Sequence, residues 1–208
     1  MLISTDNSGL QQAANAINRG ELVAFPTDTF FALGADGFNS AAVENVFVTK
    51  GRNPGTPVPL LVSGTEMAEI LVKEFPEPLK LLADEFWPGA LTVVLPASDR
   101  VPEVVTARTG TVGIRVPGHD VARELIELAG GPVTGTSCNL TGQDPINEAV
   151  VVDQVFGSQV PVVVDSPCGD SSAPSTVISF ENKKVVVLRE GAISAESLRN
   201  IVGDIVVS

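Results

Sequence analysis

Short, continuously apolar runs alternate along the chain with longer segments of helical periodicity, and this alternation constrains the fold more than any other feature. The helical periodicity predicts helices over residues 9–19, 40–49, 65–72, 78–86, 121–129 and 147–155, and a last helix after residue 194. The apolar runs predict strands over residues 21–25, 59–62, 91–95, 111–116, 133–136, 160–164, 176–180 and 185–188. Because such strands must be covered by helices, we expect an α/β fold with a mixed sheet.

Helix ends are also marked in the sequence. Gly20 is expected to end the first helix, and residues 63–66 have the spacing of a capping box for the helix that follows them. Asn147 and Ser194 are predicted to cap the two helices that begin beside them. The stretch 165–175 is rich in Ser, Pro and Gly, so we expect it to be the most mobile loop.

Length and composition narrow the class of protein. With 208 residues, 44% of them hydrophobic, the chain can bury one substantial core, and we expect a single domain over residues 1–208. It contains no apolar stretch long enough to span a membrane and no recognisable leader, so we expect a cytoplasmic protein with no membrane association. Its two cysteines lack the spacing of a zinc site, and no metal-ligating residues are predicted.

The net charge of −12 disfavours a broad nucleic-acid-binding surface, because neutralising phosphates requires clustered Lys and Arg. The few cations are therefore informative. Lys50, Arg52, Arg115 and Arg189 each lie in a segment interrupted by Gly or Pro and next to a predicted strand. We expect a local basic site on an otherwise acidic protein.

Several segments carry groups that suit an anionic ligand, and each also has a simpler structural interpretation. Residues 25–34 bring Thr and Asp to the end of a buried strand, where they form either a pocket rim or an ordinary turn. Lys50 and Arg52 flank a glycine at the end of a helix, where cations bind an anion or only cap the helix. No P-loop or dinucleotide-binding glycine pattern occurs.

Arg115 stands inside an otherwise apolar strand, so its charge needs either a structural salt bridge or an anionic ligand. Residues 134–142 place hydroxyl groups and an amide directly after a strand, where open α/β sheets bind ligands. Ser175 enters one strand and Arg189 leaves another, and each alone is a weak signal.

Taken together and in order, seven segments resemble the YrdC-like family. They are residues 26–29, 50–52, 86–89, 113–117, 137–139, 175–177 and 188–191. The most specific element is a KxR and SxN pair, here Lys50, Arg52, Ser137 and Asn139. The resemblance implies a twisted mixed β-sheet with helices on its faces around a deep cationic cavity. It further implies that L-threonine, bicarbonate and ATP are joined into threonylcarbamoyl-AMP and pyrophosphate.

The resemblance also implies a role for individual residues. Thr29, Arg115 and Ser175 would hold threonine, with Arg115 on its carboxylate. The residues implied to contact ATP are Arg52, Thr56, Thr111, Ser137, Asn139 and Arg189. Lys50 and Arg52 would be catalytic, with Lys50 near the reacting phosphate and carbamate. Positioning and charge neutralisation can then supply most of the catalysis, and Mg²⁺ is expected with the phosphates.

The chain departs from the family pattern at three places. Phe31 and Ala32 stand where the family has an aromatic hydroxyl and a glycine, and the chain contains no Tyr. The loop after Arg52 differs from the common form, which affects the expected contact of Thr56. Pro145 stands in an altered segment and is expected to give only backbone or packing contacts.

Two alternatives remain open at this point. One is a related enzyme that forms a carbamoyl-adenylate and transfers the carbamoyl group to another substrate. The other is an RNA-binding module. For the leading hypothesis, the resemblance implies a downstream tRNA threonylcarbamoyl transferase as partner, in the pathway that makes the t6A modification of tRNA.

Overall fold

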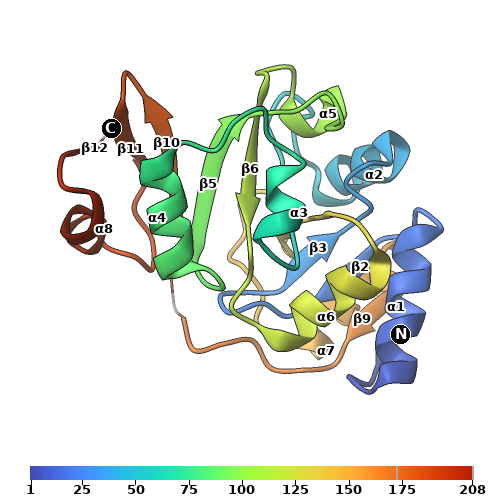
Figure 1. Ribbon diagram of the computed structural model, residues 1–208. Coiled ribbons are helices and arrows are strands. Elements are labelled where there is room, and N and C mark those ends of the chain that lie inside the picture. Colours follow the sequence, from blue (N-terminus) through green and yellow to red (C-terminus); the bar gives the residue numbers. More distant parts are fainter. Residues whose placement is uncertain (172, 208) are drawn as a thin grey trace.

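The computed structural model describes residues 1–171 and 173–207, and its strands form two mixed sheets. The first sheet has the order β1-β9-β2-β3-β8 and the second the order β12-β11-β10-β5-β6-β4-β7. Figure 1 shows β5 and β6 crossing the middle of the molecule, with β2, β3 and β9 to one side. The predicted α/β class with mixed strand directions is confirmed.

The strands are short and lie far apart in the chain. Those of the first sheet are β1 (Leu2–Ile3), β2 (Val23–Phe25), β3 (Ala32–Gly34), β8 (Thr136–Ser137) and β9 (Val162–Val164). Those of the second are β4 (Leu60–Leu61), β5 (Leu91–Pro96), β6 (Thr111–Arg115), β7 (Val133–Thr134), β10 (Thr176–Glu181), β11 (Lys184–Arg189) and β12 (Ile205–Val207). The expected single strand over 133–136 is interrupted at Gly135, so that β7 and β8 belong to different sheets.

Helices cover both faces of the first sheet. Alternate residues of β2 point to opposite sides: Val23 and Phe25 pack with α1 (Asn7–Asn18) and α6 (Asp120–Ala129), whereas Ala24 packs with α2 (Ser40–Lys50) and α7 (Ala149–Phe156). Figure 1 shows α1 and α6 side by side on one face. This sheet is buried on both sides, as its continuously apolar strands predict.

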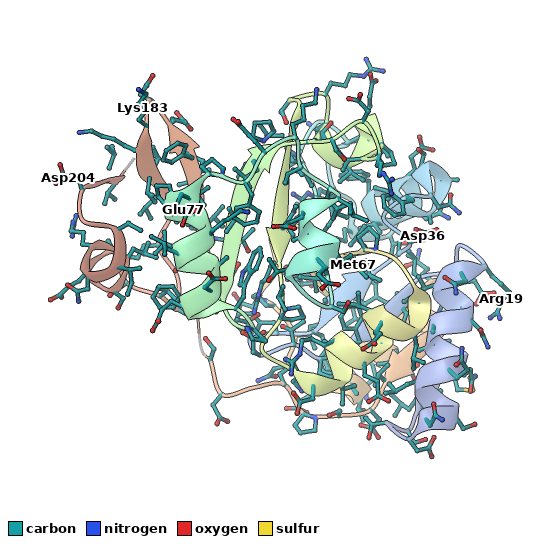
Figure 2. The ribbon with its side chains drawn as sticks, viewed as in Figure 1. Arg19, Asp36, Met67, Glu77, Lys183 and Asp204 are labelled. Atoms are coloured by element: carbon teal, nitrogen blue, oxygen red, sulfur yellow. The ribbon has the colours of Figure 1, made fainter. Side chains whose placement is uncertain are left out.

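The second sheet is covered by helices on one face only. Leu91, Val93 and Ile114 point into a core shared with α3 (Thr65–Glu69), α4 (Glu77–Phe86), α5 (Glu103–Thr106) and α8 (Ala195–Val202). Met67, on α3, packs against both this core and that of the first sheet, and Figure 2 shows it between α3 and α6. The opposite face of the second sheet is left for the candidate site.

The helix caps follow the sequence in part. Ser194 caps α8 by accepting a hydrogen bond from the Ser197 amide, as predicted. The capping box over 63–66 is wrong: α3 has no side-chain cap and ends at Glu69. Asn147 is also not the cap of α7, which follows Glu148 and has no side-chain cap. Within the described residues, no helix has the length and apolar character that crossing a membrane requires.

Candidate active site

A cavity of about 690 Å³ lies between the two sheets. Both sheets contribute to its wall, with Ala32 and Ser137 from the first and Thr92, Arg115 and Val177 from the second. Most of the residues expected at the site line this cavity. They are Thr29, Arg52, Thr111, Arg115, Ser137, Ser175 and Arg189.

The alternation of side chains along the strands explains how β5 and β6 build this wall. In β5, Leu91 and Val93 enter the helix-covered core, so Thr92 and Val94 face the cavity. In β6, Val112 and Ile114 are in the core, and Thr111, Gly113 and Arg115 face the cavity. The Arg115 side chain therefore points away from the apolar core into which its strand neighbours point. Its charge is not buried among apolar side chains, which is the free-energy cost that the sequence alone implied.

Arg52 enters the cavity from the loop that follows α2. Gly51 ends that helix in the left-handed region at φ 59°, which turns the chain back toward the sheet. The Arg52 guanidinium donates to Thr136 Oγ1 at 3.0 Å and to the Pro57 carbonyl at 2.8 Å. Burial lowers the pKa of Arg52, but a guanidinium stays protonated at neutral pH.

Arg189 and Ser175 form a second polar cluster on the cavity wall. Arg189 Nη2 donates to the Ser175 carbonyl at 2.8 Å and to Ser175 Oγ at 3.3 Å. Ser175 Oγ lies 2.9 Å from Thr92 Oγ1, so a hydroxyl group of β5 is paired with one directly before the neighbouring strand β10. Burial, and then the charge of Arg115, lower the pKa of Arg189, which indicates that two cations share one small volume.

Thr29 and Arg115 meet on another part of the wall. Arg115 Nη1 donates to Thr29 Oγ1 at 3.3 Å, and Thr29 Oγ1 lies 3.0 Å from Thr27 Oγ1. Arg115 also forms an ion pair with Asp28 at 2.5 Å. The structural salt bridge that was one interpretation of Arg115 is therefore present, and the same residue lines the cavity.

Lys50 and Asn139 lie behind the wall instead of lining it. Lys50 is 4% exposed, and its ammonium donates to the Ser137 carbonyl, to the Asn139 carbonyl at 2.7 Å and to Asn139 Oδ1 at 3.2 Å. Asn139 Oδ1 also accepts from Ser137 Oγ at 2.6 Å. The KxR and SxN segments therefore form one hydrogen-bonded cluster, in which Lys50 holds the turn at 137–139.

The segments that depart from the family pattern have different surroundings. Thr56 is exposed and does not line the cavity. Phe31 is fully buried, Ala32 pairs with Ser137 across β3 and β8, and both line the cavity together with Pro145. Three polar lining residues, Thr27, Thr92 and Thr136, were not among the predicted site residues. Alternation within the apolar run 91–95 is the signal that would have found Thr92.

The described residues that line the cavity include three arginines and several hydroxyl groups, but no carboxylate and no histidine. No group of three or more His, Cys, Asp or Glu residues in the described part of the chain is placed to hold a metal ion. The lining therefore does not offer a cage for Mg²⁺. Such a wall can bind and orient two anionic groups close together and neutralise their charge.

Comparison with known proteins shows which family model and which enzymes this chain is similar to. A family model named Sua5_yciO_yrdC, described as Telomere recombination, matches residues 15–191. The threonylcarbamoyl-AMP synthase of Pyrococcus abyssi is 38% identical over 193 residues, which are 93% of this chain and 57% of that protein. The threonylcarbamoyl-AMP synthase of Bacillus subtilis is 35% identical over 204 residues, covering 98% of this chain and 59% of that protein.

The fold agrees with a solved structure. The crystal structure of Pyrococcus abyssi Sua5 complexed with L-threonine superposes on the whole of this chain with a TM-score of 0.96 and 35% sequence identity. The match covers 62% of that chain. This chain therefore spans somewhat less than two thirds of each of these three relatives.

Proposed function

Because the chain belongs to the Sua5/YciO/YrdC family, we propose that it converts L-threonine, bicarbonate and ATP into threonylcarbamoyl-AMP and pyrophosphate. The observation that carries this proposal is the arrangement of Arg52, Arg115 and Arg189 around one cavity whose described lining has no carboxylate. The reaction brings an amino-acid carboxylate and a triphosphate together, and both need cations. Arginine binds the oxygens of either group through paired N–H donors.

In the proposed reaction, the amine nitrogen of threonine first forms a bond to the carbon of bicarbonate; the hydroxyl group of bicarbonate and a proton of the amine leave together as water, and a carbamate results. A carbamate oxygen then attacks the α-phosphorus of ATP, the bond to the β-phosphate oxygen breaks, and pyrophosphate leaves with that electron pair. The cavity needs to hold the two reactants in line and neutralise the charge that moves to the pyrophosphate. Any Mg²⁺ would come with the nucleotide as part of the substrate, because the described lining provides no carboxylate for it.

Within this proposal, Arg115 binds the threonine carboxylate, and Thr29 and Ser175 contact the same amino acid. The nucleotide is bound by Arg52, Arg189, Thr111 and Ser137.

Lys50 and Asn139 act by shaping the turn that carries Ser137, since all three ammonium donors of Lys50 are engaged there. Thr56 remains a proposed nucleotide contact and would need its loop to move inward, because it lies outside the cavity lining.

The product is a reactive mixed anhydride, so a transferase must consume it. We propose that this partner is a tRNA threonylcarbamoyl transferase of the cytoplasm, which makes the t6A modification.

The test is pyrophosphate release by the purified protein, with ATP, bicarbonate and a panel of amino acids, each component omitted in turn. Release that requires both L-threonine and bicarbonate supports the proposal. Release with another acceptor in place of threonine points to the carbamoyltransferase-like alternative and overturns it. Absence of release under every condition also counts against it, and binding of labelled RNA at low salt would then be measured for the RNA-binding alternative.

A further inference from the structure

The Arg115 guanidinium is fixed by three contacts, one on each of its nitrogens. Nε donates to the Gly89 carbonyl at 2.9 Å, Nη1 to Thr29 Oγ1 at 3.3 Å and Nη2 to Asp28 Oδ1 at 2.5 Å. A guanidinium has five N–H donors, so these contacts leave one N–H on each terminal nitrogen for a ligand. Two such donors are what a bidentate carboxylate contact requires.

Asp28 is the charged member of this set, and it lies outside the cavity lining, whereas its neighbours Thr27 and Thr29 are part of it. Its side chain is 17% exposed and that of Arg115 is 8% exposed, so the ion pair is largely shielded from water. Asp28 Oδ1 also accepts from the Gly118 amide at 2.9 Å. The carboxylate is therefore held by the loop after β6 and in turn holds the arginine at the end of β6.

We propose that Asp28 is a positioning residue for amino-acid binding, which orients the Arg115 guanidinium so that its two free N–H groups meet the carboxylate of the amino acid. The inference rests on the proposed function, since it assumes that Arg115 binds that carboxylate. Without Asp28, Arg115 must lose more rotational freedom when the amino acid binds, and this cost falls on amino-acid affinity. ATP affinity changes little, because the nucleotide contacts proposed above come from other residues.

Two substitutions separate orientation from charge. Asp28→Ala removes the acceptor for both the Arg115 and the Gly118 donors. Asp28→Asn keeps an oxygen acceptor of similar geometry but removes the negative charge. If orientation is the role of Asp28, the Asn variant recovers most of the affinity that the Ala variant loses.

A matched control is available on α6. Asp120 also forms an ion pair with an arginine, Arg123, but its side chain is 95% exposed and it does not line the cavity. Asp120→Ala therefore makes the same chemical change in an ion pair that has no part in the proposed site.

The experiment is calorimetric titration of each protein with L-threonine and, separately, with ATP, together with KM values for both from pyrophosphate release. We expect Asp28→Ala to weaken threonine binding at least about tenfold, as loss of a hydrogen bond to a charged group implies. ATP affinity should stay within about twofold of the unaltered protein, Asp28→Asn should lose only about threefold for threonine, and Asp120→Ala should change neither.

The possible results distinguish this inference from the proposed function. If the unaltered protein binds no threonine, the proposed function fails. If the unaltered protein binds threonine and both Asp28 variants bind threonine as tightly as it does, the inference alone fails. Equal weakening for threonine and ATP would make Asp28 a structural residue and also overturn the inference. Should Asp28→Ala not fold, as circular dichroism would show, Asp28→Asn still tests it: the inference requires a threonine KM raised about threefold with the ATP KM unchanged.

Discussion

At the scale of single residues, Lys50 has the most unexpected surroundings. A lysine next to an arginine in a glycine-containing loop suggests two cations that reach the same anion. Instead, Lys50 is the last residue of α2, and its side chain runs into the protein, where three oxygens of the 137–139 turn accept hydrogen bonds from its ammonium group. Arg52, two residues on, lines the cavity.

Arg52→Ala is expected to lower kcat/KM for ATP by roughly a hundredfold, because a guanidinium that neutralises phosphate charge is lost from a partly dry site. Its effect on the fold should be small, since the Arg52 hydrogen bonds to Thr136 and Pro57 lie at the cavity wall and not in the core. Pyrophosphate release as a function of ATP concentration measures the loss.

The control for Arg52→Ala is Arg19→Ala. Arg19 is 58% exposed, forms an ion pair with Glu21, and lies at the edge of the molecule in Figure 2. Equal activity of the two variants would remove Arg52 from the nucleotide site.

Lys50 makes the stability of the fold depend on pH. Burial lowers the pKa of Lys50 from 10.5 to about 8, so at neutral pH the folded state holds a charge that burial disfavours. As the pH rises above about 8, the folded state loses this proton before the unfolded chain does, and the penalty is relieved up to about pH 10.5. The difference between the two pKa values corresponds to about 3 kcal/mol in the free energy of unfolding.

We therefore compare the unaltered protein with Lys50→Met by urea unfolding from neutral pH to about pH 10.5. The free energy of unfolding of the unaltered protein should rise relative to that of Lys50→Met by about 3 kcal/mol over this range. Other titrating groups are common to both proteins. Cys138 is the one that the Lys50 charge affects, and burial raises its pKa to about 12, above the range of the experiment. A difference that does not change with pH would mean that Lys50 keeps its ordinary pKa.

At the scale of elements, most helices and the strands in apolar runs were predictable, whereas three short strands were not. Helices α2, α4 and α6 begin and end within one residue of their predicted limits, because local periodicity and end signals define them. Strands β1, β3 and β12, of two or three residues each, were missed. Leu2, for example, pairs with Val163, and no feature of the sequence near Leu2 predicts this distant partner.

The same distinction applies to the candidate site. The arginines were found because cations are scarce in this sequence, with 13 Lys and Arg against 25 Asp and Glu, and because they stand beside apolar strands. Thr92 was missed because it lies within an apolar run, and its exposure to the cavity depends on which face of β5 the helices cover. The capping prediction at residues 63–66 was wrong because Gly64, not Ser63, is the residue before α3.

The join between β7 and β8 gives a prediction at this scale. A Cβ atom added to Gly135 would lie 2.5 Å from Cγ of Leu61, which is 2% exposed. Gly135→Ala is therefore expected to destabilise the fold by about 1–3 kcal/mol, as overpacking does. It should also weaken ATP binding, since Thr136 and Ser137 follow directly.

Gly131→Ala is the matched control, because the nearest heavy atoms to its added Cβ are 3.7 Å away in Phe38. We expect its free energy of unfolding to stay within about 0.5 kcal/mol of that of the unaltered protein. Equal stability of the two variants in urea unfolding would show that Leu61 can adjust.

At the scale of the whole molecule, the candidate site lies between two sheets with separate helical coverings. The chain passes between the sheets three times: between β3 and β4, at Gly135, and along residues 165–175. The last passage was expected to be the most mobile loop. Its described residues contain no helix or strand. Two contacts connect it to the rest of the protein. The Gly169 amide donates to the Thr27 carbonyl at 3.0 Å, and His119 Nε2 lies 3.0 Å from the Pro167 carbonyl.

The sequence did not predict this division, because each strand carries information about its burial but little about its neighbours. The expectation was one sheet around a cavity. The strands separate into two sheets because residues 133–134 pair with β4, while residues 136–137 pair with β3. A single glycine between them directs the chain from one sheet to the other.

The placement of the cavity between the sheets means that a bound substrate acts as a noncovalent cross-link across the molecule. An amino acid on Arg115 and a nucleotide near Ser137 would each have to be released before the sheets could separate. Amide hydrogens of β2 and β3, remote from Arg115 in the chain, should therefore exchange with deuterium more slowly when ligand is present. At a ligand concentration of about 100 Kd the slowing approaches a hundredfold for amides that exchange only when the sheets come apart. Slowing confined to β6 and β11 would instead mean that the two sheets open independently of the ligand between them.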